Sequence, residues 1–235
     1  MSASEAPLSV SHLSLRGSNE EGVWQIQDFS YEFRACVSYG IVCARREQQR
    51  ALLNLLTLQQ LPDHGEIYIA GEPVGRLDSE SLSEVRNQRF GMLFEAPFLL
   101  PAFNVLENVA MPLFKIARVD APQAKAITEE VLDLLEMRPL MDTPVEDLSF
   151  ADQHLVAIAR AVVHHPKILV LDNFGKQLSG SDFGVVASAL RRVPSRIEAT
   201  VLMSASADRF VDIANVRLEI DGEGCREVLR RFPHE

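Results

Sequence analysis

Three arginines stand where a short apolar run gives way to a helical pattern, and their side chains could hold a phosphate. The run VSYGIVCA at 37–44 leads into Arg45, Arg46 and Arg50, at the start of a helical stretch near 47–58. Guanidiniums around a helix N-terminus can bind phosphate or a nucleotide through side chains instead of the backbone. The alternative is that they pair with Glu47 and other nearby carboxylates on a solvated face.

Asp172 and three histidines are the other groups with possible chemistry. Asp172 ends the apolar run KILVLD, where it could bind magnesium or hydrogen-bond a neighbouring loop. We favour the loop contact. His154, His164 and His165 do not have the spacing of a ligand cluster, so we expect no metal site.

Composition excludes several classes of protein. The chain has 235 residues and a formal charge of −10, from 23 Lys and Arg against 33 Asp and Glu. Broad attraction to nucleic acid is therefore not expected. The three cysteines, Cys36, Cys43 and Cys225, form no CxxC pair, which favours reduced thiols over a disulfide or zinc site. The sequence has neither a secretory signal nor an apolar run long enough to span a membrane, so we expect a cytoplasmic protein.

Strands alternate with helices along the chain, which predicts the α/β class with parallel βαβ units. Alternating apolar and polar residues predict antiparallel strands at 8–16, 23–34 and 66–70. Helical spacing predicts helices near 47–58, 122–137, 152–164 and 181–192. Continuous apolar runs predict buried strands within 37–44, 167–172 and 199–204.

Two long blocks carry a resemblance to a known family. FGMLFEAPFLLPAFNVLENVAMPL at 90–113 and LSFADQHLVAIARAVVHHPKILVLD at 148–172 resemble the Q-loop segment, and the signature helix with its Walker B strand, of ABC transporter ATPase subunits. The resemblance covers nearly the whole chain. It is closest to the subfamily that serves lipoprotein release, cell division and phospholipid trafficking.

The motif positions that bind phosphate in that family are changed here. The resemblance aligns the Walker A pattern GxxxxGK[ST] with residues 43–50, so that Gln48, Gln49 and Arg50 replace Gly, Lys and the hydroxyl residue. Glycines let the loop aim its N–H groups at phosphates, and the lysine and hydroxyl meet the β/γ charge and magnesium. We therefore expect no ATP or magnesium cofactor. If any nucleotide binds, the candidates are Arg45, Arg46, Gln49, Arg50 and Asp172.

The positions that carry catalysis in that family are also changed here. The resemblance places Glu95 at the Q-loop glutamine, Asn173 at the catalytic glutamate and Ser206 at the switch histidine. An amide cannot act as a general base. Phe150 and Ala151 replace the signature glycines, and no aromatic residue is apparent near Leu15 or Arg16 to stack on adenine. We expect a pseudo-ATPase with no catalytic residue.

A cluster of apolar residues lies where the family receives the coupling helix of its membrane subunit. The resemblance assigns partner docking to Phe98, Leu99, Leu100, Phe103 and Val105. These side chains could instead be ordinary core residues, because apolar residues are usually buried.

The resemblance implies a P-loop NTPase (RecA-like) parallel-sheet core with an antiparallel β subdomain, over 7–94 and 157–232, and a helical subdomain over 95–156. Our leading hypothesis is a non-hydrolysing structural or regulatory subunit of a membrane transport complex for lipid or lipoprotein. It would sit on the inner face of the cytoplasmic membrane through an integral-membrane permease, and a homologous active ATPase is a second candidate partner. Two alternatives stay open: half of an asymmetric heterodimer with a composite ATP site, and a soluble regulatory module that binds a phosphate-bearing ligand through its arginines.

Overall fold

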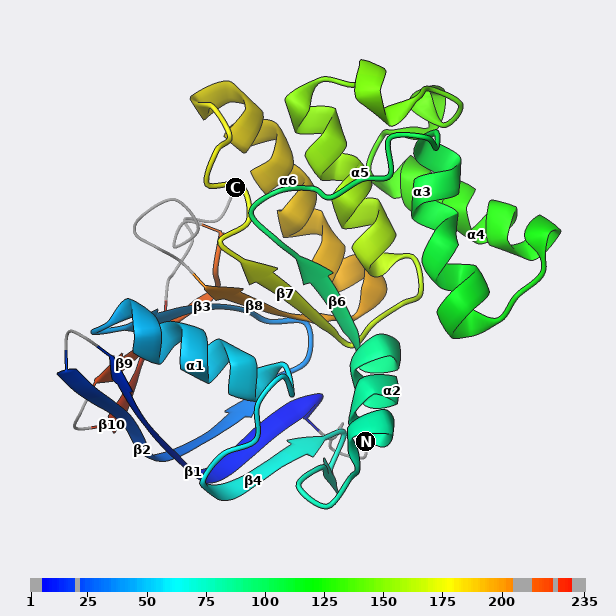
Figure 1. The fold of residues 1–235 in the computed structure, drawn as a ribbon. Coiled ribbons are helices and arrows are strands. Elements are labelled where there is room, and N and C mark those ends of the chain that lie inside the picture. The colour runs from blue at the N-terminus through cyan, green and yellow to red at the C-terminus, as the bar shows by residue number, and fades with distance from the viewer. Residues whose placement is uncertain (1–5, 20–21, 205–212, 222–223, 230–235) are drawn as a thin grey trace. The chain divides into compact units, whose positions relative to one another are not determined.

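The computed structural model describes residues 6–19, 22–204, 213–221 and 224–229 (Figure 1). The chain divides into two compact units: unit 1 comprises Met1–Phe90 and Thr200–Glu235, and unit 2 comprises Gly91–Ala199. The segment 95–156, expected to form a helical subdomain, lies within unit 2. The finer boundaries suggested by the sequence stay a prediction.

An antiparallel sheet in unit 1 has the strand order β2-β1-β4-β5. Its strands are β1 (Leu8–Asn19), β2 (Gly22–Phe33), β4 (His64–Ile69) and β5 (Glu72–Pro73). The alternation read from the sequence places Leu8, Leu13, Ile26 and Phe33 on buried positions. The pairing of β1 with β2 shifts register on both sides of Leu13, and His12 and Asp28 there have positive φ angles of 53° and 52°.

The second set of strands in unit 1 is built around β3 (Ser38–Cys43). β3 pairs in parallel with β8 (Thr200–Ser204) and β9 (Val216–Asp221), and β10 (Gly224–Leu229) pairs antiparallel with β9. Helix α1 (Arg46–Leu56) contacts β2, β3 and β8 through its leucine face. Helix α2 (Ser79–Arg89) completes unit 1 and buries only Leu82.

Unit 2 holds most of the helices (Figure 1). Helices α3 (Val105–Pro112) and α4 (Ala121–Leu134) pack against α5 (Phe150–Val162), and α5 packs against α6 (Gly180–Ile197). A π-helical turn at Leu113–Ala117 and 3₁₀ turns at Arg138–Leu140 and Val145–Asp147 connect them. The strands of this unit are β6 (Phe90–Leu93), whose first residue belongs to unit 1, and β7 (Ile168–Asp172).

The parallel strands and the helices between them confirm the α/β class. The first four residues of β7, ILVL, are buried, as expected of a strand covered on both faces. In the described ranges, no helix is both long enough and apolar enough to cross a membrane.

Candidate functional site

The connection from β3 to α1 consists of two residues, Ala44 and Arg45. No residue of the range 38–56 has a positive φ, so the backbone there does not adopt the tight conformations of a glycine-rich phosphate loop. Gln48 is buried in the first turn of α1, and its Nε2 donates to the carbonyl of Gln25 at 2.8 Å. A packed side chain therefore occupies the position where a close backbone approach would need a glycine.

Positive charge is concentrated at the start of α1. Arg45, Arg46 and Arg50 are exposed, and Gln49 is half-buried. Within the part of the chain that the structure describes, no ion pair joins any of these arginines to a carboxylate. Arg45 is the N-cap of α1 and gives the helix no side-chain cap; its Nη1 donates instead to the carbonyl of Val23 at 3.1 Å.

This set of residues fits phosphate in part. The exposed guanidiniums can donate to phosphate oxygens, and the first-turn N–H groups of α1 have no side-chain cap. The same residues fit magnesium poorly. Magnesium prefers oxygen ligands, and Arg50 stands where the Walker A pattern has a Ser or Thr hydroxyl. The described residues contain no cluster of three or more His, Cys, Asp or Glu side chains that could hold a metal.

Glu95 meets the segment that follows β7, within unit 2. Its Oε1 accepts from Nε2 of Gln177 at 3.3 Å and lies 3.7 Å from Nζ of Lys176. The side chain keeps 39% of its exposure, so the ion pair is weak. The structure thus gives Glu95 partners on the 176–177 segment, which sequence reasoning did not foresee.

Asp172 and Asn173 lie side by side at the end of β7. Asp172 is half-buried and Asn173 is exposed, with a φ of 51° that an Asn tolerates better than most residues. Nδ2 of Asn173 donates to Oδ1 of Asp172 at 3.1 Å. The group next to the strand-end carboxylate is therefore an amide that hydrogen-bonds it. Ser206 lies outside the described residues.

The N-terminus of helix α5 is capped by Ser149 and packed with aromatic side chains. Ser149 accepts from the N–H of Asp152 at 3.1 Å and donates to its carboxylate at 2.6 Å. The ring of Phe150 lies 4.6 Å from that of the buried His154, which in turn lies 5.3 Å from Phe174. Nδ1 of His154 is 2.8 Å from the carbonyl of Phe150, so Nδ1 must carry the proton. Nε2 has no hydrogen-bond partner among the described residues. Aromatic packing replaces glycine at this helix end.

The apolar docking candidates are mostly exposed. Phe98 is 67% exposed, Leu100 and Phe103 are each 38% exposed, and Leu99 is half-buried. Val105 is fully buried at the start of α3, so it offers no surface to a partner. We leave Val105 out of the docking segment, which from here on means residues 98–103.

Two side chains fix the backbone of this docking segment. Arg160 of α5 donates from Nη1 to the carbonyl of Phe98 at 2.8 Å and from Nη2 to that of Pro97 at 2.7 Å. Burial lowers the pKa of Arg160. The buried amide of Asn108 bonds both the N–H and the carbonyl of Leu100, at 2.8 and 3.1 Å. Phe98 has a positive φ of 44°, and these bonds hold that conformation in place.

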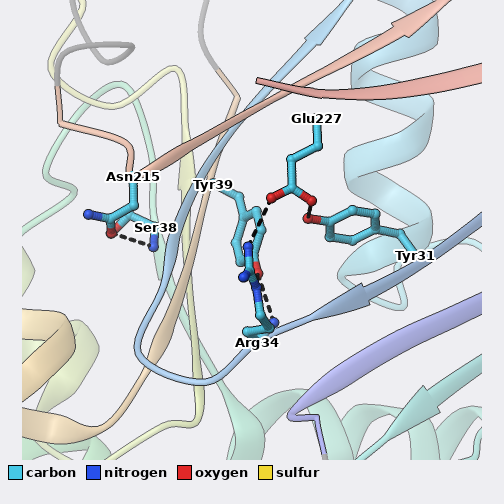
Figure 2. A network of polar contacts seen from close by, with 6 residues as sticks. All are labelled: Tyr31, Arg34, Ser38, Tyr39, Asn215 and Glu227. Atoms are coloured by element: carbon cyan, nitrogen blue, oxygen red, sulfur yellow. Dashed lines mark hydrogen bonds and ion pairs between the residues drawn. The ribbon is translucent and has the colours of Figure 1, made fainter. Parts of the chain in front are cut away.

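A polar network in unit 1 ties β10 to β2 (Figure 2). Glu227 of β10 accepts from the hydroxyl of Tyr31 and from Nη2 of Arg34, both at 2.9 Å. The hydroxyl of buried Tyr39 accepts from the N–H of Arg34 at 2.8 Å. Burial and then the hydrogen bond to Glu227 raise the pKa of Tyr31.

Partial burial makes the thiol of Cys43 unreactive. Burial, and then the nearby Cys225, raise the pKa of Cys43 to about 12. The thiol is therefore protonated at neutral pH, and a protonated thiol is a poor nucleophile and metal ligand. Cys36 and Cys43 are free thiols in the structure.

The model of the ABC transporter family matches residues 51–174, more than half of the chain. The chain belongs to the ABC transporter family. A relative in Saccharophagus degradans, the lipoprotein-releasing system ATP-binding protein LolD, is 31% identical over 70% of this chain and 72% of its own length. The methionine import ATP-binding protein MetN 1 of Acinetobacter baylyi is 29% identical over 85% of this chain, and the match spans only 57% of that relative.

Solved ABC cassettes share the fold. The dimeric ATP-binding cassette MJ0796, in a post-hydrolysis state bound to ADP and Pi, matches with a TM-score of 0.76 at 20% identity, over 96% of this chain and 100% of that one. At that identity the likeness shows the fold alone, and the expected P-loop NTPase architecture is confirmed.

Family membership corrects one expectation from the sequence. The lost Walker A pattern led us to expect no ATP or magnesium cofactor, and that expectation is wrong. The relatives are named as ATP-binding proteins, and the structural neighbour holds ADP and Pi. The error came from treating the backbone cradle as the sole means of holding phosphates, although arginine side chains can also donate to them.

Sequence reasoning missed two functional candidates. Trp24 lies across from Gly17, the residue after Arg16, so an aromatic side chain does stand close to the place where none was apparent. Its signal was the pairing of two strands that follow each other closely in the sequence, which places residues 17 and 24 opposite each other. Arg160, which orders the docking segment, was hidden because its partners lie 62 and 63 residues away.

Proposed function

We propose that this chain is a non-hydrolysing subunit of a membrane transport complex for lipid or lipoprotein, which uses ATP as a structural or regulatory ligand. The chain is an ABC-family subunit, and its LolD relatives belong to lipoprotein-releasing systems. The proposal adds the loss of hydrolysis, the class of cargo and the membrane partner.

Asn173 is the observation that carries the loss of hydrolysis. The residue after the strand-end Asp172 is an amide, and its Nδ2 already donates to that carboxylate at 3.1 Å. An amide has no pKa near neutrality, so it cannot take a proton from an attacking water. Glu95 is likewise engaged by Gln177 and Lys176. The amide of Asn173 therefore supports a subunit without a general base next to the strand-end carboxylate.

Arg45, Arg46 and Arg50 would hold the nucleotide's phosphates, with the half-buried Gln49 as a further donor. All three arginines are exposed and free of carboxylate partners among the described residues. Side-chain donors bind phosphate without a glycine loop. When bound, ATP would supply negative charge that orders these side chains and stabilises the fold by mass action.

The docking segment would bind an integral-membrane permease, and the complex would lie against the membrane through that partner. Phe98, Leu100 and Phe103 supply exposed apolar area, and large apolar side chains are the usual anchors of an interface. A homologous active ATPase is the expected second partner, because this chain lacks a base of its own. Nothing in its charge favours nucleic acid.

Phosphate release tests the loss of hydrolysis. The full chain should bind magnesium-ATP in a calorimeter and release no phosphate above a protein-free blank, both alone and in membranes with its co-purified permease. Asn173→Ala should leave the blank-level rate unchanged, because no base is lost. Release above the blank that Asp172→Asn abolishes would overturn the proposal. Absence of ATP binding would remove the nucleotide from it.

Association with the permease is tested separately. When the wild-type chain is purified from native membranes, an integral-membrane subunit should co-purify with it. The double variant Phe98→Ser, Phe103→Ser should recover less of that subunit. Exposed Val185→Ser on α6 is the matched control, since it removes apolar surface elsewhere in unit 2. Equal recovery by all three chains would contradict docking through residues 98–103.

A further inference from the structure

His154 is a buried titratable residue that the proposed function does not use. It lies in α5 and is 0% exposed. Its Nδ1 donates to the carbonyl of Phe150, four residues earlier, at 2.8 Å. Its Nε2 has no hydrogen-bond partner among the described residues. Because a neutral imidazole carries one proton, and Nδ1 holds it, Nε2 is a buried acceptor that this part of the chain leaves unsatisfied.

Two aromatic rings pack against this imidazole. The ring centre of Phe150 lies 4.6 Å away at an interplanar angle of 69°, and that of Phe174 lies 5.3 Å away at 60°. Phe174 is 1% exposed, whereas Phe150 is 39% exposed. Phe150 is also the first residue of α5. The position of its ring and the first turn of the helix therefore both depend on contact with His154.

The charged groups on the elements that pack against α5 are exposed or bonded away from this ring. Helices α3, α4 and α6 contact α5, and Phe174 belongs to the segment after β7. The carboxylates with other partners are Glu107 on α3, Glu129 on α4, Asp182 on α6, Asp152 on α5 itself and Asp172 after β7. The cations with other partners are Arg160 on α5 and Lys176 after β7. The remaining charged residues of α4 and α6 are exposed. Within the described ranges, no ion pair joins His154 to a carboxylate.

A second proton on His154 is therefore unfavourable while the imidazole stays packed. It would add a positive charge and an unpaired N–H to a site lined by two apolar rings. The N-terminal end of α5, one turn away, carries a partial positive charge that also opposes a cation. An imidazole in water changes its charge between about pH 5 and 8. Lowering the pH across that range favours any state in which His154 reaches water.

We propose that His154 is a proton-controlled latch on the first turn of α5. The neutral imidazole holds the ring and the carbonyl of Phe150. The protonated imidazole displaces that ring, opens the turn over residues 149–153 and gains contact with water. The latch is complete at the alkaline end of the range and is lost as the pH falls, because the packed state favours the neutral form. It lies within unit 2 and needs neither nucleotide nor permease, so it goes beyond the proposed function.

Amide hydrogen exchange of the full chain tests the latch. The N–H groups of Asp152 and Gln153 both bond to Ser149, and these bonds close the first turn. Exchange over residues 152–154, corrected for the intrinsic effect of pH, should speed up about 10-fold between about pH 7.5 and 5.5, because an opening that takes up a proton becomes easier in acid. The imidazole resonances of His154 should titrate over the same range. Exchange over residues 186–193 of α6 should stay constant.

Variants identify the group that takes up the proton. His154→Gln keeps a neutral N–H donor and removes the titration, so exchange over residues 152–154 should no longer depend on pH. His165→Asn is the matched control, because His165 is exposed and has a φ of 54° that Asn tolerates. This control should keep the wild-type response. Phe150→Ala removes the ring that must move, so exchange should already be fast at about pH 7.5 and should change less with pH.

Three results would overturn the inference. If His154→Gln keeps the wild-type pH response, another group controls the turn. If exchange speeds up equally over residues 152–154 and 186–193, acid destabilises unit 2 as a whole and no latch exists. If His154 stays neutral down to about pH 5, or takes up a proton while exchange over residues 152–154 stays constant, its charge does not open the turn. The last two results come from the wild-type chain, so they decide the matter even where a variant does not fold.

Discussion

Arg160 donates to the main-chain carbonyl of Phe98 at 2.8 Å, and its second donor reaches the adjacent Pro97 at 2.7 Å. A half-buried cation thus fixes the backbone of the residue with the most exposed large apolar side chain among the described residues. Helix α5 of unit 2 thus fixes the backbone of the docking segment, while the ring of Phe98 is exposed to solvent.

Replacing Arg160 should destabilise the protein and loosen the docking segment. Arg160→Leu leaves two carbonyls without their donors, and we expect the free energy of unfolding to fall by about 2 to 4 kcal/mol. Amide exchange should speed up over residues 97–103. Urea unfolding and hydrogen exchange measure the two effects. Arg191→Leu, on an exposed part of α6, should change neither; equal losses in both variants would contradict this role.

Truncation of Val105 should cost more stability than truncation of Phe98. Phe98→Ala removes an exposed ring, and we expect it to lower the free energy of unfolding by less than about 1 kcal/mol. Val105 is 0% exposed, so Val105→Ala should lower it by about 2 kcal/mol. Urea unfolding of both variants gives the comparison. A larger loss from Phe98→Ala would mean that its ring is part of the core.

The Tyr31 hydroxyl should make stability fall at alkaline pH. Burial and the bond to Glu227 raise the pKa of Tyr31 in the folded state, so its contribution is complete below the unfolded pKa of about 10 and is lost as the pH rises above that value. We expect the wild-type advantage over Tyr31→Phe to shrink between about pH 9.5 and 11. Urea unfolding of both chains across this range measures it. An advantage that stays constant with pH would be inconsistent with the shift.

Two glycines should respond to alanine in opposite directions. Gly17→Ala places a methyl group 2.1 Å from the Trp24 ring, so we expect a loss of about 1 to 3 kcal/mol and a red shift of the tryptophan emission. Gly184 lies in α6 with no atom within 4 Å of an added Cβ. Gly184→Ala should therefore gain about 0.5 to 1 kcal/mol through helix propensity. Thermal unfolding and fluorescence test both; an unshifted emission in Gly17→Ala would mean that the indole has another resting place.

Much of the fold was predictable because its main elements have strong periodic patterns. The predicted helix over 47–58 is observed as Arg46–Leu56, and the apolar run KILVLD forms β7. Helix α2 was not predicted, since it buries only Leu82 and has no apolar stripe to reveal it. The capping Asp78, which accepts from the N–H of Ser81, was its one local signal.

The site was predictable where neighbours in the sequence are neighbours in space. Asp172 and Asn173 adjoin in the chain, and their contact follows from that. The partners of Glu95 lie more than 80 residues away, and only the folded chain reveals them. The pairing of Trp24 with Gly17 depended on strand register, which shifts on both sides of Leu13 and which residue types alone do not fix.

The buried Gln48 also bears on how this chain could change over evolutionary time. A return to glycine at that position would remove its bond to Gln25 and place glycine in the first turn of a helix, which together cost about 1 to 2 kcal/mol. A lysine and a hydroxyl would still be missing at Gln49 and Arg50. A change of Gln48 to glycine therefore lowers stability before the rest of the glycine loop is present, so gradual substitution works against a return to that loop.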